Sequence, residues 1–593
     1  MKTFYNITVS AIAALLVFCA CDKAAFITRA PYSSTSPEKF YENPSQMKMA
    51  LTSCYETITT HKIPGLSFCQ AGSYSQGLYY IMNAPSDDII SNATAQGEGI
   101  ELENCIHDES SAAIRNFWKV FFTGINRCNT VLDYVDGVNG LSEDEKTVYK
   151  AEARFLRAFF YYHLAWNFGG VPIIEKSITA GQEPRSSLKD VYEFIFKDLD
   201  YAYNNIPEEG GIISNMSINR YVVSAYIGRI CNYLAACKRY GTGEDFVEEQ
   251  PLNSFDWVDA DAMTQKALDN LRYVVEESPY ELNGDFRLNF LELSKPAQTK
   301  ECLFIAEQAT NGVEGYWPAS YYLPTPAMAT TSDIPGSFGG RHVPTQKIFY
   351  MYSTDDPRRD WNITGRYSDG YREFTLDGHT YAQPTYQDTI KASNLPYPYY
   401  TSPTQSYSPA SSYKCCTGKF RLAKATEVVH TFKQHALGYP LMRLADVYLM
   451  YAEAIWFSDN AREDEARGWM DKVLERAASD EANYLALKAE YHNDDFLEEL
   501  LESRARELFM ECSRKWDLIR FNRIDAAIEN IDPASFKNVY RGAPLDEKYY
   551  VVNDVIAGLY KTLKQNWFNY KIWLPISEEQ RGVNKNLVQN AGW

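Results

Sequence analysis

The 593-residue sequence lacks the patterns that identify several large classes of protein. No segment holds eighteen consecutive apolar residues, so no transmembrane helix is predicted. There is no C-x-x-C pair and no H-E-x-x-H among the eight histidines, which leaves a zinc site without support. No G-x-S-x-G elbow, P-loop or G-x-G-x-x-G occurs, so the common hydrolase and nucleotide-binding signatures are missing as well.

Basic residues are in the minority. Lys and Arg total 58 against 77 Asp and Glu, which gives a net charge of -19. A phosphate backbone is repelled at this balance, so nucleic-acid binding is excluded as the main function. The content of hydrophobic residues, 45%, and of charged residues, 23%, is that of a folded globular protein.

The N-terminus predicts export. Lys2 precedes an apolar run of about ten residues ending at Phe18, which is too short for a bilayer-spanning helix of about 20 residues. Phe18, Cys19 and Ala20 before Cys21 resemble a bacterial lipobox, so residues 1–20 are predicted to be a signal peptide and Cys21 the lipidated residue. Cys19 as the modified residue and plain secretion are the alternatives.

Ten cysteines follow Cys21 in the predicted mature chain. Export permits disulfides, but the spacing specifies no pairing. We expect free buried thiols or one or two bridges.

Most of the periodic sequence predicts helices. Ser142 and Glu145 match a capping box, apolar residues then recur every three or four positions, and Gly169 and Gly170 end the helix. Leu441 to Ile455 form a second apolar stripe. Further helices are predicted at 116–134, 188–205, 219–238, 260–277, 462–479 and 494–520. Paired helices with small residues at close positions resemble degenerate tetratricopeptide hairpins.

The segment from 311 to 440 differs. It is rich in Pro, Gly, Ser, Thr and Tyr and lacks helical periodicity, so loops with short strands are predicted. Connections of this length are usually functional or disordered, and the density of rings argues against disorder. The predicted organisation is therefore a helical part at 21–310, a loop-rich region at 311–440 and a helical part at 441–593.

Six stretches, in order, resemble the SusD/RagB family of outer-membrane nutrient-binding lipoproteins. The longest is E-A-R-F-L-R-A-F-F-Y-Y-H-L-A-W-N-F-G-G-V-P-I-I at 152–174. The others lie at 118–129, 356–359, 439–454, 502–520 and 574–593. Cys512 and Ser513 depart from the pattern, because the family usually shows Gly and His there.

The resemblance implies a mainly α fold of tetratricopeptide-like hairpins and a binding protein rather than an enzyme. Such proteins form a lid on a TonB-dependent transporter of the SusC type at the cell outer membrane and capture oligosaccharides, or peptides in some branches. No cofactor is predicted, and structural calcium is left open. The family-signature residues expected to form the scaffold through ion pairs are Arg154, Arg157, Arg506, Arg514 and Asp517.

One carboxylate cluster tests the alternative of glycoside hydrolysis, which needs two carboxylates about 5 to 9 Å apart. Asp355, Asp356 and Asp360 lie close in the sequence, but Arg358 and Arg359 lie among them. We expect these arginines to neutralise the cluster, which leaves no catalytic pair.

Aromatic residues favour sugar binding. The chain holds 11 Trp, 44 Tyr and 30 Phe, and a sugar ring needs flat aromatic platforms beside hydrogen-bonding groups. The resemblance implies that ligand contacts come from the region near Trp317 and from the stretch before 118. The predicted ligand residues are Tyr79, Asp88, Asn92, Tyr316, Trp317, Tyr321 and Arg341. A peptide-binding protein and a mainly structural lid of the transporter are the alternatives.

Overall fold

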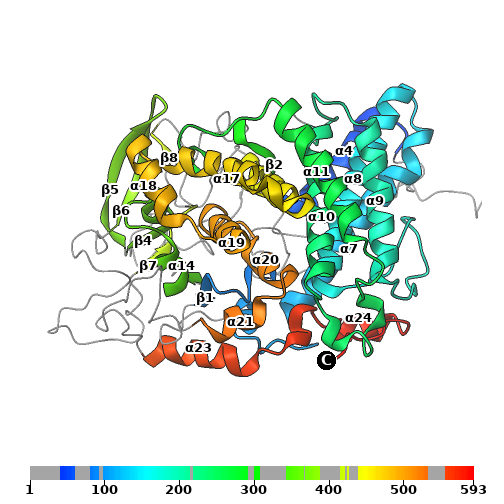
Figure 1. Cartoon of the computed structure of the whole chain (residues 1–593). Helices are drawn as coiled ribbons and strands as arrows, with labels where there is room; N and C mark the ends of the chain where they lie inside the picture. Colours follow the sequence, from blue (N-terminus) through cyan, green and yellow to red (C-terminus); the bar gives the residue numbers. More distant parts are fainter. Residues whose placement is uncertain are drawn as a thin grey trace, which may run out of the picture.

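The computed structural model describes residues 41–59, 81–91, 98–213, 218–291, 300–306, 342–365, 367–386, 415–420, 424–426, 438–531 and 554–593. Helices dominate these residues, as predicted, and the strands between residues 363 and 425 lie together on the left in Figure 1. One cluster of buried apolar side chains extends along the chain from Met47 to Leu587. In the described part of the chain, no helix has the length and apolar character needed to cross a membrane.

The N-terminal helices pack as neighbouring hairpins. Helix α7 contacts α4 and α8, α8 contacts α9, and α10 contacts α11, so helices adjacent in sequence lie side by side (Figure 1). Their bounds are α4 Pro44–Thr59, α6 Glu98–Glu103, α7 Ala112–Tyr134, α8 Glu143–Phe168, α9 Leu188–Asn205, α10 Arg220–Arg239 and α11 Ala260–Glu277. This arrangement confirms the predicted helical-hairpin architecture.

Helix α8 begins and ends where its sequence predicts. Ser142 accepts a hydrogen bond from the backbone N–H of Glu145, whose side chain accepts one from the backbone of Ser142 in return. Gly169 follows the helix with φ +74°, a conformation that favours glycine. Between these ends, Phe155 and Phe159 both make edge contacts with Phe304, so the helix packs into the core through its rings.

The C-terminal part is also mainly helical, and its described helices have at most 15 residues. They are α16 Leu444–Ser458, α17 Glu463–Ala477, α18 Glu481–Tyr491, α19 Phe496–Glu507, α20 Arg514–Arg520, α21 Ile524–Glu529, α23 Asp554–Asn566 and α24 Glu578–Val583. The described residues also hold six 3-10 helices, at Val135–Gly137, Glu244–Phe246, Pro251–Asn253, Phe286–Phe290, Asn460–Arg462 and Asn569–Ile572.

Two predicted helices were wrong in extent. The stripe beginning at Leu441 starts in a strand, because β9 (Tyr439–Arg443) pairs with β2 (Cys302–Ala306) before α16 begins. The helix predicted at 494–520 is interrupted between α19 and α20, where Met510 and Cys512 have φ of 65° and 59°. Left-handed backbone cannot continue a right-handed helix, so the chain turns there.

Short strands occur in the region predicted to be loop-rich. With β1, β2 and β9, which lie wholly or partly outside that region, the described strands form two-stranded ladders β1–β3, β2–β9 and β4–β7 and a three-stranded sheet β5–β6–β8. The remaining bounds are β1 Ile89–Ser91, β3 His342–Pro344, β4 Ile363–Gly365, β5 Tyr367–Leu376, β6 His379–Tyr386, β7 Cys415–Thr417 and β8 Lys424–Ala425, with helices α14 Gln346–Met351 and α15 Pro357–Asn362.

Seven cysteines of the described residues are buried free thiols, as in the first of the two expected alternatives. They are Cys54, Cys105, Cys128, Cys231, Cys237, Cys302 and Cys512. Burial raises the pKa of Cys231 to about 12, so this thiol stays protonated and inert at neutral pH.

Glu152 of α8 is a buried carboxyl that joins three parts of the chain. It is fully buried, and it accepts hydrogen bonds from the Tyr55 hydroxyl of α4, at 2.5 Å, and from the Ile212 backbone N–H. Burial raises the pKa of Glu152 from 4.5 to about 7, although both hydrogen bonds lower it. The folded state therefore takes up a proton at a pH where the unfolded chain does not.

The Glu152→Gln variant is expected to remove a pH dependence of stability. Between pH 4.5 and 7 the folded wild type binds more protons than the unfolded chain, so its free energy of unfolding falls as the pH rises, by up to about 3 kcal/mol. Urea unfolding at pH 5 and pH 8 measures this fall, which should shrink in Glu152→Gln and persist in the exposed control Glu143→Gln. Equal pH dependence in both variants would contradict the assignment to Glu152.

Candidate ligand-binding site

The structure pairs two short strands that lie next to predicted ligand residues in the sequence. Strand β1 pairs antiparallel with β3, with Ile89 opposite Pro344 and Ser91 opposite His342. Two of the predicted residues are sequence neighbours of the Ser91–His342 pair: Asn92 follows Ser91, and Arg341 precedes His342. Segments about 250 positions apart in sequence therefore meet at this ladder.

Hydrogen bonds extend the junction beyond the ladder. Thr345, directly after β3, donates its hydroxyl to the carbonyl of Asp87 at 2.6 Å and its backbone N–H to the carbonyl of Asp88 at 2.9 Å. The Nζ of Lys347 lies 2.5 Å from the Asp87 carboxylate. The chain from β3 into α14 is thus attached to the segment before β1 by a backbone hydrogen bond, a hydroxyl hydrogen bond and an ion pair.

Asp87 links this junction to the C-terminal helices. Arg514 of α20 binds both carboxylate oxygens of Asp87, at 2.7 and 2.9 Å. Burial by itself would raise the pKa of Asp87, but Arg514 and Lys347 hold it well below its usual value. Asp87 is therefore a charged anchor inside the protein. Sequence reasoning did not identify its partner Lys347, and no motif around Lys347 pointed to it.

Asp88 is the one predicted ligand residue in the described part of the chain. Its side chain is buried, with 3% of the residue exposed, and its carboxylate accepts a hydrogen bond from Ser86 at 2.5 Å. Burial raises the pKa of Asp88 to about 6. The side chain thus lies in the interior of the junction. The other predicted positions, Tyr79, Asn92, Tyr316, Trp317, Tyr321, Arg341 and the lipidation site Cys21, lie outside the described residues.

The family-signature charges form ion pairs, as predicted for scaffold residues. Arg157 binds Asp198 at 2.7 Å, and Arg154 lies 3.6 Å from the same carboxylate, so α8 is tied to α9. Asp517 pairs with Arg504 and with Arg520, each at 2.8 Å. Arg506 pairs with Glu502 at 3.0 Å. These charged groups therefore stabilise the fold through internal ion pairs.

Two of the three carboxylates considered for hydrolysis, Asp356 and Asp360, are paired with arginines. The Nη2 of Arg358 lies 2.8 Å from Asp356, which also accepts a hydrogen bond from Tyr491 at 2.8 Å. Arg359 pairs with Asp360 at 3.1 Å. Because Asp356 is buried and fully engaged, it does not form a free carboxylate pair with its neighbours.

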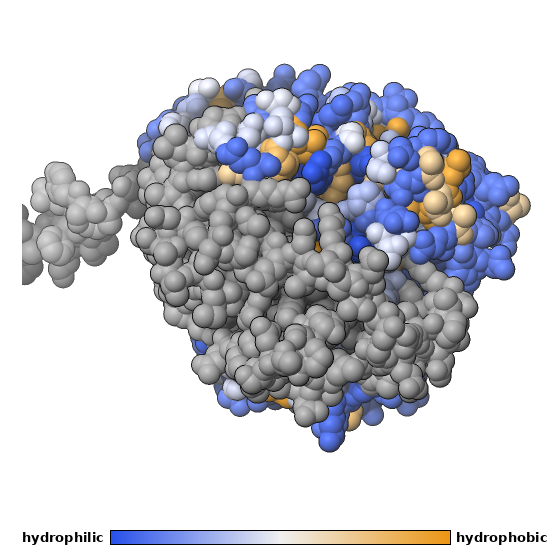
Figure 2. All heavy atoms as spheres, turned by 90° about the vertical axis from the view of Figure 1, so that its left-hand side faces the viewer, coloured by the Kyte–Doolittle hydropathy of each residue, from blue (hydrophilic) through white to orange (hydrophobic). Residues whose placement is uncertain are grey.

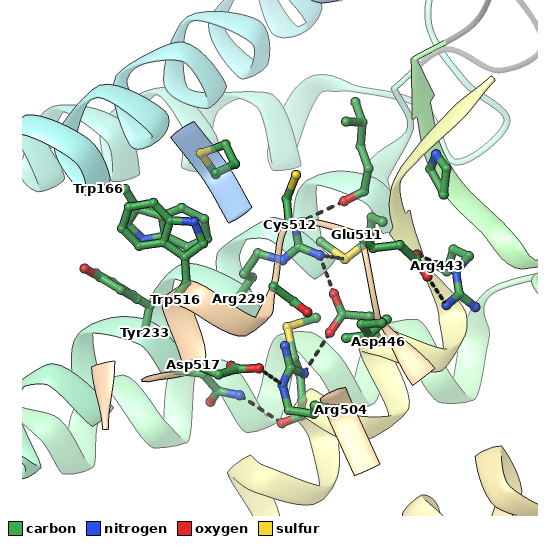
Figure 3. Close-up of a pocket in the computed structure, with 18 of the residues that line it drawn as sticks. Trp166, Arg229, Tyr233, Arg443, Asp446, Arg504, Glu511, Cys512, Trp516 and Asp517 are labelled. Atoms are coloured by element: carbon green, nitrogen blue, oxygen red, sulfur yellow. Dashed lines mark hydrogen bonds and ion pairs between the residues drawn. The ribbon is translucent and has the colours of Figure 1, made fainter. Parts of the chain in front are cut away.

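A cavity lies between the N-terminal helices and the C-terminal part. Trp166 and Trp516 stack on one side of it, with ring centroids 4.6 Å apart, while Arg443 and Glu511 lie on the other side (Figure 3). Between them, Asp446 accepts from Arg504 at 2.8 Å and from Arg229. The charges that line the cavity are therefore already paired with one another.

The cavity is too small for a sugar chain. Its volume is about 60 Å³, whereas sites for small organic ligands span roughly 300 to 1,000 Å³. A polar space of this size accommodates only a few water molecules, at roughly 10 to 15 Å³ for each. We therefore assign the cavity to the scaffold and not to ligand capture.

Cys512 lies in a turn whose backbone conformation accounts for the glycine that the family pattern has at this position. Cys512 has a φ of 59°, which favours glycine, the residue that the family usually shows there. Asn83, from the segment before β1, donates to the Cys512 sulfur at 3.1 Å and accepts from its backbone N–H at 3.2 Å. The turn between α19 and α20 thus contacts the chain that leads into the β1–β3 junction.

The described surface is polar on the side where the strands lie. On the face shown in Figure 2, the described residues are mostly hydrophilic, and hydrophobic side chains form small separate groups. Within the described residues, no group of three or more His, Cys, Asp or Glu side chains is placed to hold a metal ion.

These features define a class of protein: a helical-hairpin scaffold with paired internal charges, in which two segments distant in sequence pair as short strands. Comparison with protein families is consistent with this class. The model of the SusD family matches residues 294–593, and the model described as "Starch-binding associating with outer membrane" matches residues 42–233. The chain belongs to the SusD family.

Individual relatives agree. The chain is 23% identical over 500 residues to SusD-like protein P2 of Formosa agariphila, covering 83% of this chain and 86% of the relative. The fold resembles a SusD homolog from Bacteroides thetaiotaomicron, with a TM-score of 0.67, 17% identity and coverage of 95% and 99% of the two chains. It also resembles the surface glycan-binding protein A from Bacteroides fluxus, with a TM-score of 0.63, 18% identity and coverage of 93% and 100%.

Proposed function

We propose that this protein binds oligosaccharides or polysaccharide at the cell surface and delivers them to a TonB-dependent outer-membrane transporter of the SusC type. The observation that supports the proposal is the β1–β3 ladder, whose strands are adjacent in sequence to the predicted ligand residues Asn92 and Arg341, in a protein of the SusD family. A surface glycan-binding protein among the similar structures supports the same ligand class.

The proposed location is the outer membrane, with the chain anchored by lipid on Cys21. The lipobox-like sequence before Cys21 supports this anchor, and the description of the family model that matches residues 42–233 names the outer membrane. Lipid attachment through more than one acyl chain holds a protein firmly, at about 0.8 kcal/mol for each buried CH₂.

Binding is proposed to occur without hydrolysis. Of the carboxylates that could have formed a catalytic pair, Asp356 is paired with Arg358 and Asp360 with Arg359, and Asp446 in the cavity is paired with Arg504. Turnover of polysaccharide by the purified protein would contradict this part of the proposal.

The Trp317→Ala variant tests the proposed aromatic platform. Loss of one stacking ring is expected to weaken glycan binding by about tenfold, because a ring contributes about 1.4 kcal/mol through contact with the sugar face. A glycan array identifies the ligand, and calorimetry with wild type and variant measures the affinity.

The matched control is Phe568→Ala, which removes an exposed ring outside the proposed site. It should bind as the wild type does. Unchanged affinity in Trp317→Ala would remove that residue from the site. Recovery of oligopeptides, with no glycan bound, would favour peptide capture instead.

A further inference from the structure

Lys347 adds an ion pair between two segments that the β1–β3 ladder and the Thr345 hydrogen bonds also join. It lies on α14, three residues after β3, and its side chain is 21% exposed. Its Nζ lies 2.5 Å from the fully buried carboxylate of Asp87, which precedes β1. The ion pair therefore spans the β1–β3 ladder at the end near Ile89 and Pro344.

Asp87 has two cationic partners with different roles. Arg514 binds both of its oxygens from α20, in the two-point geometry that satisfies a carboxylate best. Lys347 approaches the same carboxylate from the β3 side. If Lys347 is removed, Asp87 keeps its guanidinium partner, so the buried charge is still compensated.

The two cations therefore have different roles: Arg514 compensates the buried charge of Asp87, and Lys347 ties the β3 side to the segment before β1. Removal of Arg514 would leave the buried Asp87 carboxylate with the Lys347 ammonium alone. Removal of Lys347 takes away the ion pair between α14 and the segment before β1. Thr345 still contributes its backbone and hydroxyl hydrogen bonds to residues 87 and 88. The fold is thus expected to survive without Lys347, with the two segments less firmly held together.

We propose that Lys347 is a positioning residue for ligand binding, because its ion pair with Asp87 holds the β1 and β3 segments in the relative placement that the ligand site requires. The proposal rests on the proposed function, since these segments lead into the predicted ligand residues. Lys347 is not proposed to touch the ligand.

The test compares Lys347→Met with Lys347→Arg and with Lys150→Met. Lys150 is a suitable control, because it is 25% exposed and pairs with Asp136 at 2.6 Å outside the junction. Lys347→Met should bind the array-identified glycan about fivefold more weakly, with a melting temperature within about 3 °C of wild type. Lys347→Arg should restore affinity to within about twofold, and Lys150→Met should bind as wild type does.

Hydrogen exchange gives a readout that needs no ligand. In Lys347→Met, amides in both 81–91 and 342–351 should exchange faster than in the wild type, because the two segments loosen together. Faster exchange in 342–351 alone, or unchanged affinity in Lys347→Met, would overturn the proposal. If the wild type binds no glycan, the proposed function fails, while the exchange result still decides whether Lys347 couples the segments.

Discussion

Replacement of Arg443 by methionine is expected to lower the free energy of unfolding by about 3 to 5 kcal/mol. Arg443 is 1% exposed, and its guanidinium contacts Glu301 at 2.6 Å, Glu507 at 3.0 Å and Glu511 at 2.7 Å. Methionine fills similar space but leaves buried carboxylates with fewer cations. Urea unfolding at pH 7 measures the loss.

Other cations determine how large this effect is. Arg476 also pairs with Glu301 and Glu507, and Arg358 also pairs with Glu507. The matched control is Arg462→Met, in which a 36% exposed arginine loses its pair with Glu465 and about 1 kcal/mol or less is expected. If Arg443→Met lost no more stability than this control, the network would not depend on its central arginine.

Replacement of Arg514 by methionine is expected to cost about 3 to 5 kcal/mol as well and to abolish glycan binding. The Asp87 carboxylate is completely buried, and it would keep only Lys347 as a charged partner. Since Asp87 anchors the chain before β1, the β1–β3 junction would loosen with it. Urea unfolding and calorimetric titration of the glycan measure the two effects.

The control for this prediction is Arg523→Met, which removes a half-buried partner of Glu498. A loss below about 1 kcal/mol and normal binding are expected for it. Retention of glycan affinity in folded Arg514→Met would show that the Asp87 anchor is not needed for the ligand site.

Much of the helical fold could be predicted from the sequence. Helices 188–205 and 260–277 match α9 and α11 at both ends, and α8 begins at its capping box. Such boundaries depend on side chains within four residues of one another, so they are visible in the local sequence. The family signature also indicated correctly that Arg157 and Asp517 serve the scaffold.

Errors arose where distant segments decide the backbone. Leu441 has the spacing of a helical stripe, yet it lies in β9, because β2, about 140 positions earlier in the sequence, pairs with β9. The turn at Cys512 interrupts a helix where the chain must contact Asn83, more than 400 positions away. Periodicity within one segment carries no information about such partners.

The candidate site also combines features that the local sequence predicts with features that distant segments decide. Composition and family resemblance pointed to two aromatic or polar regions, and the described structure places their neighbouring residues in one ladder. Asp88 was proposed as a hydrogen-bonding ligand residue, and the structure places its carboxylate in the interior beside Ser86. The role of an acidic residue depends on what packs over it, and adjacent positions in the sequence do not specify that packing.

The sequence by itself determined the helical class, the family and the ends of the best helices, because these follow from local spacing and short signatures. Only the tertiary structure decided that Asp87 would meet Lys347 and Arg514, which lie 260 and 427 positions away. A buried carboxylate must find cations wherever the fold brings them, so its partners are chosen by packing and not by sequence distance.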